Sequence, residues 1–333
     1  MQIVAGTFAA LAAWEAVLHP MAGELREPPR PDVSCDSPDG RVIATRQTEE
    51  GTAIAHFSRC GARLTGNAAI AGAPYDVLLG DSFIAARQVD DDETMGAELE
   101  RIARRSGERL NVRQYGWGGA SPAQYIAAAP AVLRKWRPSH VIVLLSGDDF
   151  GADTTLGLPP RLLVAADGSW RIDTTGAKQG FLAPAPRVAL ASLVERRWAL
   201  LVARAPVLVR RLAALGGEHR APDAHMDDTP HAEVADAAVR ALHETYGGRL
   251  LLVYIADVRA TDDGAAPAES MMLKACAKHG VRCVSTRPAM LEARRAGVLA
   301  RGFSTTVIGV GHLNADGHAL VAREIWRMTR RTR

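Results

Sequence analysis

The chain lacks several features that would indicate particular classes of protein. Its 40 Lys and Arg residues against 37 Asp and Glu residues leave a formal net charge of only +3, which gives no case for a nucleic-acid partner. No spacing of Cys and His matches a zinc site, because His225 and His231 lack partners and the ten histidines are scattered. The glycines match neither a dinucleotide-binding fingerprint nor a P-loop.

The composition is that of a folded protein. With 333 residues, 47% of them hydrophobic, the chain can bury one large core with insertions or two modest cores. A disordered protein would not carry this share of apolar residues.

The N-terminal region contains an Ala-rich apolar run, Ile3 to Trp14, followed by a Pro-rich linker around Pro28 and Pro31. The run is too short to span a bilayer but fits the apolar region of a signal segment, although basic residues before it are missing. Residues 1–24 are therefore expected to be an export signal or truncated membrane anchor, or else an amphipathic helix that packs on the domain. Residues 25–72 are expected to be a linker and an N-terminal β extension.

The four cysteines form two pairs that are local in sequence, Cys35 with Cys60 and Cys276 with Cys283. An even number and local pairing suit two disulfides in an oxidising compartment, which favours an extracytoplasmic location. The alternative is four small buried apolar residues, which leaves a cytoplasmic location open.

Residues 41–64 alternate polar and apolar side chains around Glu49-Glu50-Gly51, which predicts a β-hairpin that covers an edge of the main domain. After Tyr75, strands and helices alternate, which predicts a mostly parallel sheet covered by helices on both faces. The expected strands lie near residues 77–79, 110–113, 141–145, 250–255 and 281–285. The expected helices lie near residues 94–105, 122–136, 229–246 and 268–279.

An insertion at about residues 151–228 interrupts this alternation. It contains a predicted hairpin, 162–165 with 170–173, and a long apolar and basic helix from Val188 to Leu215. Such an insertion after a central strand commonly forms a lid or a substrate wall. A membrane-facing or dimerising arm is the alternative.

Gly80-Asp81-Ser82 ends the first predicted strand of the alternating region. Gly80 can adopt a backbone conformation closed to other residues, and a hydroxyl directly after such a turn is exposed at the end of the sheet. Open α/β sheets place their chemistry at this end of the strands. The tripeptide alone is also what an ordinary strand-to-loop turn would show.

The second expected strand is followed by a Gly-rich turn that leads into a helix. Ser121 is a good helix N-cap, Pro122 suits the first helical position and Gln124 completes a capping box. Gly119 therefore lies just before a helix N-terminus, where free amides favour a negative oxygen. A plain Gly-rich turn is the alternative.

Two more polar groups follow later strands. Ser146-Gly147-Asp148-Asp149 ends the third strand, and Gly311-His312-Leu313-Asn314 precedes the C-terminal helix. Asn314 is the predicted cap of that helix, so His312 lies in the loop ahead of it and can reach a cleft. His318 falls inside the helix and is expected to be a packed or surface residue.

Together these blocks resemble the SGNH, or GDSL-type, hydrolase family over roughly residues 75–327. Gly80-Asp81-Ser82 matches the first block and Gly119 the second. Gly147-Asp148-Asp149 stands where the third block has Gly-x-Asn-Asp, and His312 with the residues after it resembles the last block. The resemblance implies that residues 73–333 form a flavodoxin-like three-layer α/β/α domain, which hydrolyses an ester with a serine nucleophile.

Carried over residue by residue, the resemblance makes Ser82 the nucleophile and His312 the base that takes its proton. The backbone N–H groups of Ser82 and Gly119 would hold the oxyanion, with Asp148 in the position of the third donor. Asp81 and Asp149 would support the site. The resemblance implies neither a metal ion nor an organic cofactor.

Two positions depart from the family pattern. The family usually has an Asp three residues before the catalytic His, and here that position is Gly309. A backbone carbonyl or a carboxylate from elsewhere would have to orient the imidazole, so the sequence predicts a Ser-His dyad. The third-block Asn is replaced by Asp148, which can act as a donor only if burial and the nearby Asp149 keep it protonated.

Three functions remain open at the level of sequence. The favoured one is hydrolysis of a small-molecule or carbohydrate ester, such as acetyl groups on an envelope carbohydrate. Acyl transfer to a sugar hydroxyl begins with the same acyl-serine. The third is a binding or scaffold protein that keeps the fold but has lost catalytic activity.

Overall fold

The computed structural model describes residues 31–35, 43–47, 50–51, 53–151, 160–165, 168–175, 230–258, 264–304, 306 and 309–330. All of them belong to one compact unit, formed by residues 27–177 and 227–333. The segment expected at residues 1–24 and the helix expected from Val188 to Leu215 lie outside the described residues. No helix within the described part of the chain has the length and apolar character needed to span a membrane.

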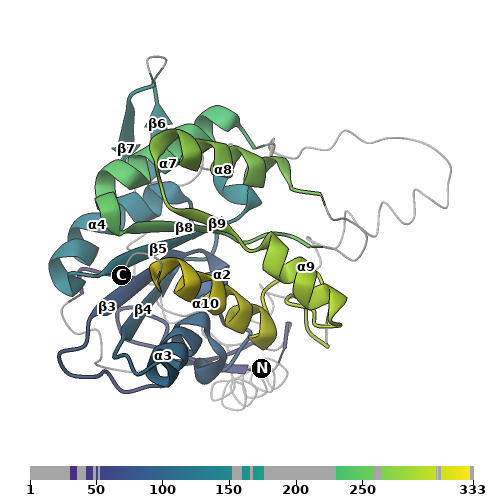
Figure 1. Cartoon of the computed structure of the whole chain (residues 1–333). Helices are drawn as coiled ribbons and strands as arrows, with labels where there is room; N and C mark the ends of the chain where they lie inside the picture. Colours follow the sequence, from purple (N-terminus) through teal and green to yellow (C-terminus); the bar gives the residue numbers. More distant parts are fainter. Residues whose placement is uncertain are drawn as a thin grey trace, which may run out of the picture. The chain divides into compact units, whose positions relative to one another are not determined.

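The centre of the unit is a parallel five-stranded sheet (Figure 1). In sheet order its strands are β4 (Asn111–Gly116), β3 (Tyr75–Gly80), β5 (His140–Leu145), β8 (Leu250–Tyr254) and β9 (Cys283–Ser285). Chain order therefore reverses at β3, which lies between β4 and β5, and this is the strand order of flavodoxin-like folds. Ligands bind such sheets beyond the carboxyl ends of the strands at this reversal.

Helices cover both faces of the sheet, as the alternating pattern predicts (Figure 1). On one face lie α4 (Pro122–Trp136), α7 (Ala232–Tyr246) and α8 (Pro267–His279). On the other lie α3 (Met95–Arg105) and α10 (Ala315–Arg330). The three-layer α/β/α architecture expected from the sequence is therefore present.

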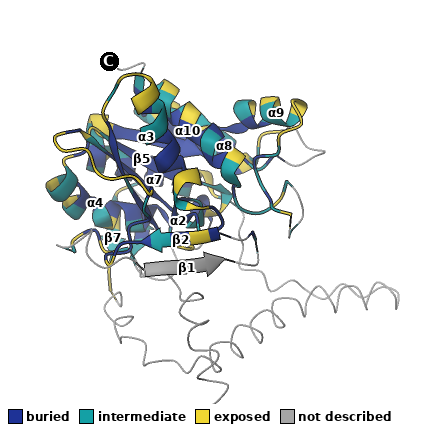
Figure 2. Ribbon diagram, turned by 90° about the horizontal axis from the view of Figure 1, so that it is seen from below, coloured by how far each residue is buried: buried dark blue, intermediate teal, exposed yellow. Residues whose placement is uncertain are grey.

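The core lies between these layers, and Figure 2 shows the strands and the inward sides of the helices as buried. Apolar side chains of β3, β5 and β8 are almost completely buried, which explains their continuous rather than alternating hydrophobic runs. The shorter elements are α2 (Ser82–Ala85), α9 (Arg287–Arg295), η1 (Asp91–Glu93), η2 (Gly147–Phe150) and η4 (Gly247–Arg249).

Two antiparallel hairpins accompany the sheet. β1 (Ile43–Gln47) pairs with β2 (Ala53–Phe57), and β6 (Arg161–Val164) pairs with β7 (Trp170–Asp173), so both hairpins expected from the sequence are present. Just after β2, the Arg63 amide donates to the carbonyl of Gln114 at 2.9 Å, which covers the edge strand β4.

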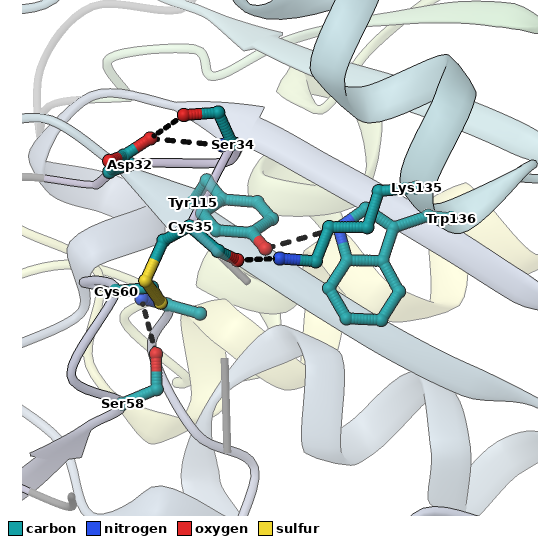
Figure 3. Close-up of a disulfide and its surroundings, with 9 residues drawn as sticks. Asp32, Ser34, Cys35, Ser58, Cys60, Tyr115, Lys135 and Trp136 are labelled. Atoms are coloured by element: carbon teal, nitrogen blue, oxygen red, sulfur yellow. Dashed lines mark hydrogen bonds between the residues drawn. A yellow bond between two sulfur atoms is a disulfide. The ribbon is translucent and has the colours of Figure 1, made fainter. Parts of the chain in front are cut away.

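Both cysteine pairs are disulfides, Cys35 with Cys60 and Cys276 with Cys283. Figure 3 shows the first of them, where Lys135 of α4 donates to the carbonyl of Cys35. The Cys60 carbonyl accepts the amide of Asp32 at 2.8 Å. The first disulfide therefore holds residues 31–35 against the segment that follows β2.

Candidate active site

Ser82 is presented at the carboxyl end of the central strand β3. It is the first residue of α2, and the side chain of Asp81 caps this helix by accepting the amide of Phe83 at 2.8 Å. A Cβ on Gly80 would lie 2.5 Å from Cγ1 of Ile84, so only glycine lets the short helix pack so close to the strand end. The serine is half-buried, with its hydroxyl at the reversal point of the sheet.

His312 is held in a loop that pairs with the chain before it. The carbonyl of His312 accepts the amide of Gly302 at 3.0 Å, and the amide of Asn314 donates to Ala300 at 3.2 Å. The Asn314 side chain accepts the amide of Gly317 at 3.0 Å and so caps α10, as predicted. His312 therefore lies ahead of the cap, where the sequence places it.

The structure brings these two predicted residues into contact. Nε2 of His312 and Oγ of Ser82 lie 2.9 Å apart, although 230 positions separate them in sequence. The ring of Phe83 lies beside the imidazole, with 5.6 Å between ring centroids. A histidine at this distance from a serine hydroxyl has the geometry of a general base for a nucleophile.

The other ring nitrogen corrects the sequence-based prediction of a dyad. Nδ1 of His312 contacts Oε2 of Glu50, in the turn of the β1–β2 hairpin. The hydrogen bond to His312 lowers the pKa of Glu50, while partial burial opposes that shift. The prediction was wrong because the periodicity of residues 41–64 indicates a hairpin but not where its turn docks. The only signal was the pair of acids before Gly51.

Two other carboxyl groups lie beside the serine. Asp149 is buried, and desolvation, together with the charge of Asp81, raises its pKa well above the usual range. Its Oδ2 accepts the amide of Ser146 at 2.6 Å. The carboxyl group of Asp81 is surrounded by protein, although the residue keeps some solvent contact; desolvation raises its pKa to about 6, and the charge of Asp148 contributes.

Asp148 does not fit the argument made for it from the sequence. That argument required burial of Asp148, but the residue is exposed and its neighbour Asp149 is the buried one. The chain turns into η2 directly after β5, and Asp149 faces inward in this turn to accept the amide of Ser146. Desolvation therefore acts on Asp149 and not on Asp148.

Gly119 lies in the turn after β4, the strand that pairs with β3. It adopts a φ of 67°, and its exposed Cα leaves room, since an added Cβ would meet no described atom within 4 Å. The expected caps of the following helix are present, with Ser121 and Gln124 forming a capping box and Pro122 at its start. The geometry leaves access to the Gly119 backbone from solvent.

A cation near the serine was not expected from the sequence. Arg301 donates to Oδ1 of Asp257 at 3.0 Å, and its guanidinium lies 4.9 Å from the centroid of the Phe83 ring. Burial lowers the pKa of Arg301, while the charges of Asp257 and Asp81 oppose that shift. No motif marks Arg301, which adjoins the site because its segment pairs with the His312 loop.

Within the described ranges, no cluster of three or more His, Cys, Asp or Glu side chains is arranged to bind a metal ion.

Comparison with known proteins gives similarity to solved structures only. The chain matches no protein-family model and no curated protein. A two-domain esterase active on acetylated mannans matches with 13% identity and a TM-score of 0.40, over 78% of this chain and 49% of that one. The chain thus spans about half the length of that protein.

Two other solved structures match over nearly their full length. LAE5, an α/β hydrolase enzyme from the metagenome of Lake Arreo in Spain, has 13% identity and a TM-score of 0.44, covering 78% of this chain and 96% of that one. A catalytic mutant of Axe2, an acetylxylan esterase from Geobacillus stearothermophilus, has 11% identity and a TM-score of 0.40, covering 79% and 96%. Similarity of this degree does not extend to activity or substrate.

Proposed function

We propose that the chain is a serine ester hydrolase of the SGNH type, which cleaves acyl esters, and acetyl esters in particular, through an acyl-serine intermediate. The observation that carries the proposal is the 2.9 Å contact between Oγ of Ser82 and Nε2 of His312. The four sequence blocks and the flavodoxin-like strand order support it, because Ser82 follows the carboxyl end of β3, where open α/β sheets bind their ligands.

The proposed reaction has two steps, the formation of the acyl-serine and its hydrolysis. In the first, Nε2 of His312 takes the proton of Ser82 as Oγ attacks the acyl carbonyl, and the N–H groups of Ser82 and Gly119 hold the oxyanion. The intermediate collapses, the ester C–O bond breaks, and His312 returns the proton to the leaving alcohol. In the second step, water attacks the acyl-serine with His312 again as base, which releases the acid and restores Ser82.

We further propose that the substrate is an acetyl ester on an envelope carbohydrate and that the protein works outside the cytoplasm. The two disulfides support this location, because such bonds persist in oxidising compartments. Fusing residues 1–24 to a phosphatase that is active only outside the cytoplasm tests export. An inactive fusion in expressing cells would reject it.

The activity is tested by labelling with a fluorophosphonate and by turnover of p-nitrophenyl acetate. We expect labelling of the wild type at Ser82, and a loss of turnover of at least about 10³-fold in both Ser82→Ala and His312→Ala. His318→Ala should keep most turnover if it folds, since His318 is buried in α10 and does not contact Ser82. A dead His318→Ala with an active His312→Ala would overturn the assignment.

The same assay separates the other two functions. Adding an acetylated donor and a sugar acceptor in water distinguishes the fates of the acyl-serine, because a transferase would form the acetylated sugar faster than free acetate. A folded wild-type protein that the fluorophosphonate does not label would instead indicate a binding or scaffold protein.

A further inference from the structure

The His312 loop supplies no acid to its own histidine. Gly309 occupies the position that the resemblance assigns to an Asp, and Gly309 and Gly311 both have positive φ, of 86° and 98°. Among the described residues, the carboxylate that contacts Nδ1 of His312 is that of Glu50, which comes from the β1–β2 turn 262 positions earlier.

The carboxylate of Glu50 lies in a closely fitted site. A Cβ on Gly311 would lie 2.7 Å from its Oε1, so a larger residue there would displace it. Nε2 of Gln88 donates to Oε2 at 3.2 Å. The next residue, Gly51, has a φ of 118°, and a Cβ on it would lie 3.0 Å from the Phe303 ring and 3.1 Å from the carbonyl of Gln88. Glycines thus permit the close approach of the turn on both sides.

The hairpin is also fastened along its second strand. The amide of Ile54 donates to Asp90 at 3.0 Å, and the amide of His56 donates to Asp91 at 3.0 Å. Arg63, whose side chain is fully buried, pairs with Asp91 as well. Strand β2 is therefore joined to the segment that runs from the serine to α3, and this holds Glu50 at a fixed place beside His312.

An anionic partner at Nδ1 has two effects on a histidine base. It keeps the proton on Nδ1, which leaves Nε2 unprotonated and able to accept from Ser82. It also stabilises the imidazolium that forms when the serine proton is transferred. The hydrogen bond to His312 lowers the pKa of Glu50, so its carboxylate stays ionised at neutral pH and can do both.

We propose that Glu50 is the positioning residue for His312, so that the N-terminal hairpin completes a Ser82–His312–Glu50 triad. This rests on the function proposed above. The hairpin is then part of the active site and not only a cover for the sheet edge. The acid that the family usually places in the His312 loop is supplied here by an N-terminal segment.

The test compares Glu50→Gln with Glu50→Asp, and uses Glu49→Gln as the matched control, which removes a carboxylate at the preceding position of the sequence. We expect Glu50→Gln to lower kcat by about 10²- to 10⁴-fold with little change in KM, because the carboxylate acts through His312. Glu50→Asp should recover about tenfold or more of this loss, since it keeps the charge. Glu49→Gln should match the wild type.

Proton binding to the His312 ring can also be measured. It would not change in Glu50→Gln if Glu50 only stabilised the fold. Among the described residues, Asp81 and His318 also interact electrostatically with this ring, and both are retained in every variant. By nuclear magnetic resonance of ¹⁵N-labelled histidine, the His312 ring should take up its proton at lower pH in Glu50→Gln than in the wild type. The acidic limb of its kcat/KM profile should move in the same direction.

The outcomes for the two proposals differ. If the wild type is labelled and Glu50→Gln keeps its kcat and its histidine titration, the triad is overturned and the serine hydrolase stands. If the wild type is neither labelled nor active, the hydrolase is rejected, and the resonance measurement still decides whether Glu50 pairs with His312. Thermal unfolding at an unchanged temperature excludes simple loss of the fold.

Discussion

Single residues around Ser82 differ in function because they differ in burial. Asp149 is buried and holds its own strand end through the amide of Ser146, whereas Asp148 is exposed one position earlier. Asp81 lies between these extremes and caps the helix that carries Ser82. Three aspartates close together in space therefore have three environments, and Asp148 is the most exposed of them.

Replacement of Asp148 tests whether this carboxylate limits the rate. Asp148 is exposed, so the burial that the donor argument required is absent, and a carboxylate at this place would oppose an oxyanion on Ser82. Asp148→Asn removes the charge and adds a donor, so we expect acetyl-ester hydrolysis at neutral pH to rise, by up to about 10²-fold. The measurement is kcat for both proteins from acidic to alkaline pH. A variant slower than the wild type throughout would give the carboxylate a function of its own.

Because His318 is buried, the stability of the folded protein is expected to depend on pH. Burial lowers its pKa from 6.5 to about 3, and its Nδ1 has no hydrogen-bond partner within the described structure. Between these pH values the unfolded chain binds a proton at His318 and the folded chain does not, so acidification favours unfolding. Its contribution to stability is full above pH 6.5 and is lost towards pH 3, at about 1.4 kcal/mol for each pH unit.

Urea unfolding of wild type and His318→Gln over this pH range measures that contribution. The raised pKa values of Asp81 and Asp149 act in the opposite sense, but they are common to both proteins and cancel in the difference. The difference in free energy of unfolding should therefore shrink as the pH falls. A constant difference would show that His318 takes up its proton equally in both states.

At the scale of elements, the placement of the serine depends on how closely α2 approaches the sheet. A Cβ on Gly116, the last residue of β4, would lie 2.0 Å from the backbone nitrogen of Ala85 in α2. The nearest atoms are backbone, which cannot rotate away. The contact between α2 and β4 therefore requires glycine at this position.

Gly116→Ala should lower the free energy of unfolding by about 1 to 3 kcal/mol or more, and should lower turnover because α2 carries Ser82. Gly118→Ala is the matched control two residues later, where an added Cβ would meet no described atom within 4 Å. Urea unfolding and p-nitrophenyl acetate turnover measure both effects. Equal stability of the two variants would contradict the close approach.

Elements with a strong local pattern were predictable from the sequence. The five parallel strands and the caps at Ser121 and Asn314 follow from hydrophobic runs and from short-range hydrogen bonding, both of which the local sequence determines. Helix α9 was not expected, because four of its nine residues are charged and only Arg287 and Met290 are buried. Glu50 and Arg301 reach the site through tertiary packing, and no local pattern encodes where a turn or a loop docks.

At the scale of the whole molecule, the first disulfide joins the N-terminal segment to the chain just after the hairpin that carries Glu50. Cys60 follows β2 closely and is bonded to Cys35, in a segment held by Lys135 of α4. The loop closed here spans 25 positions, against 7 for Cys276 and Cys283. The longer loop constrains the unfolded chain more, and it also lies next to the hairpin that carries Glu50.

Replacing Cys35 and Cys60 together with Ser should cost about 2 to 4 kcal/mol of unfolding free energy and should also reduce kcat. Replacing Cys276 and Cys283 should cost less and leave kcat near the wild-type value. Mass spectrometry of unreduced protein checks the starting state, and four free thiols would contradict both disulfides. If the two double variants had equal kcat, the first disulfide would have no part in positioning Glu50.

The contact between Glu50 and His312 also bears on the order in which the protein matures. A nascent chain exposes its N-terminal part first, so the hairpin is made long before the loop that carries the histidine. Closing a contact across 262 positions depends on the strands and helices in between, because non-local contacts become favourable only when the intervening chain is ordered. A chain in which the His312 loop has not yet been made therefore carries Ser82 without its proposed base, and we expect such a chain to be inactive.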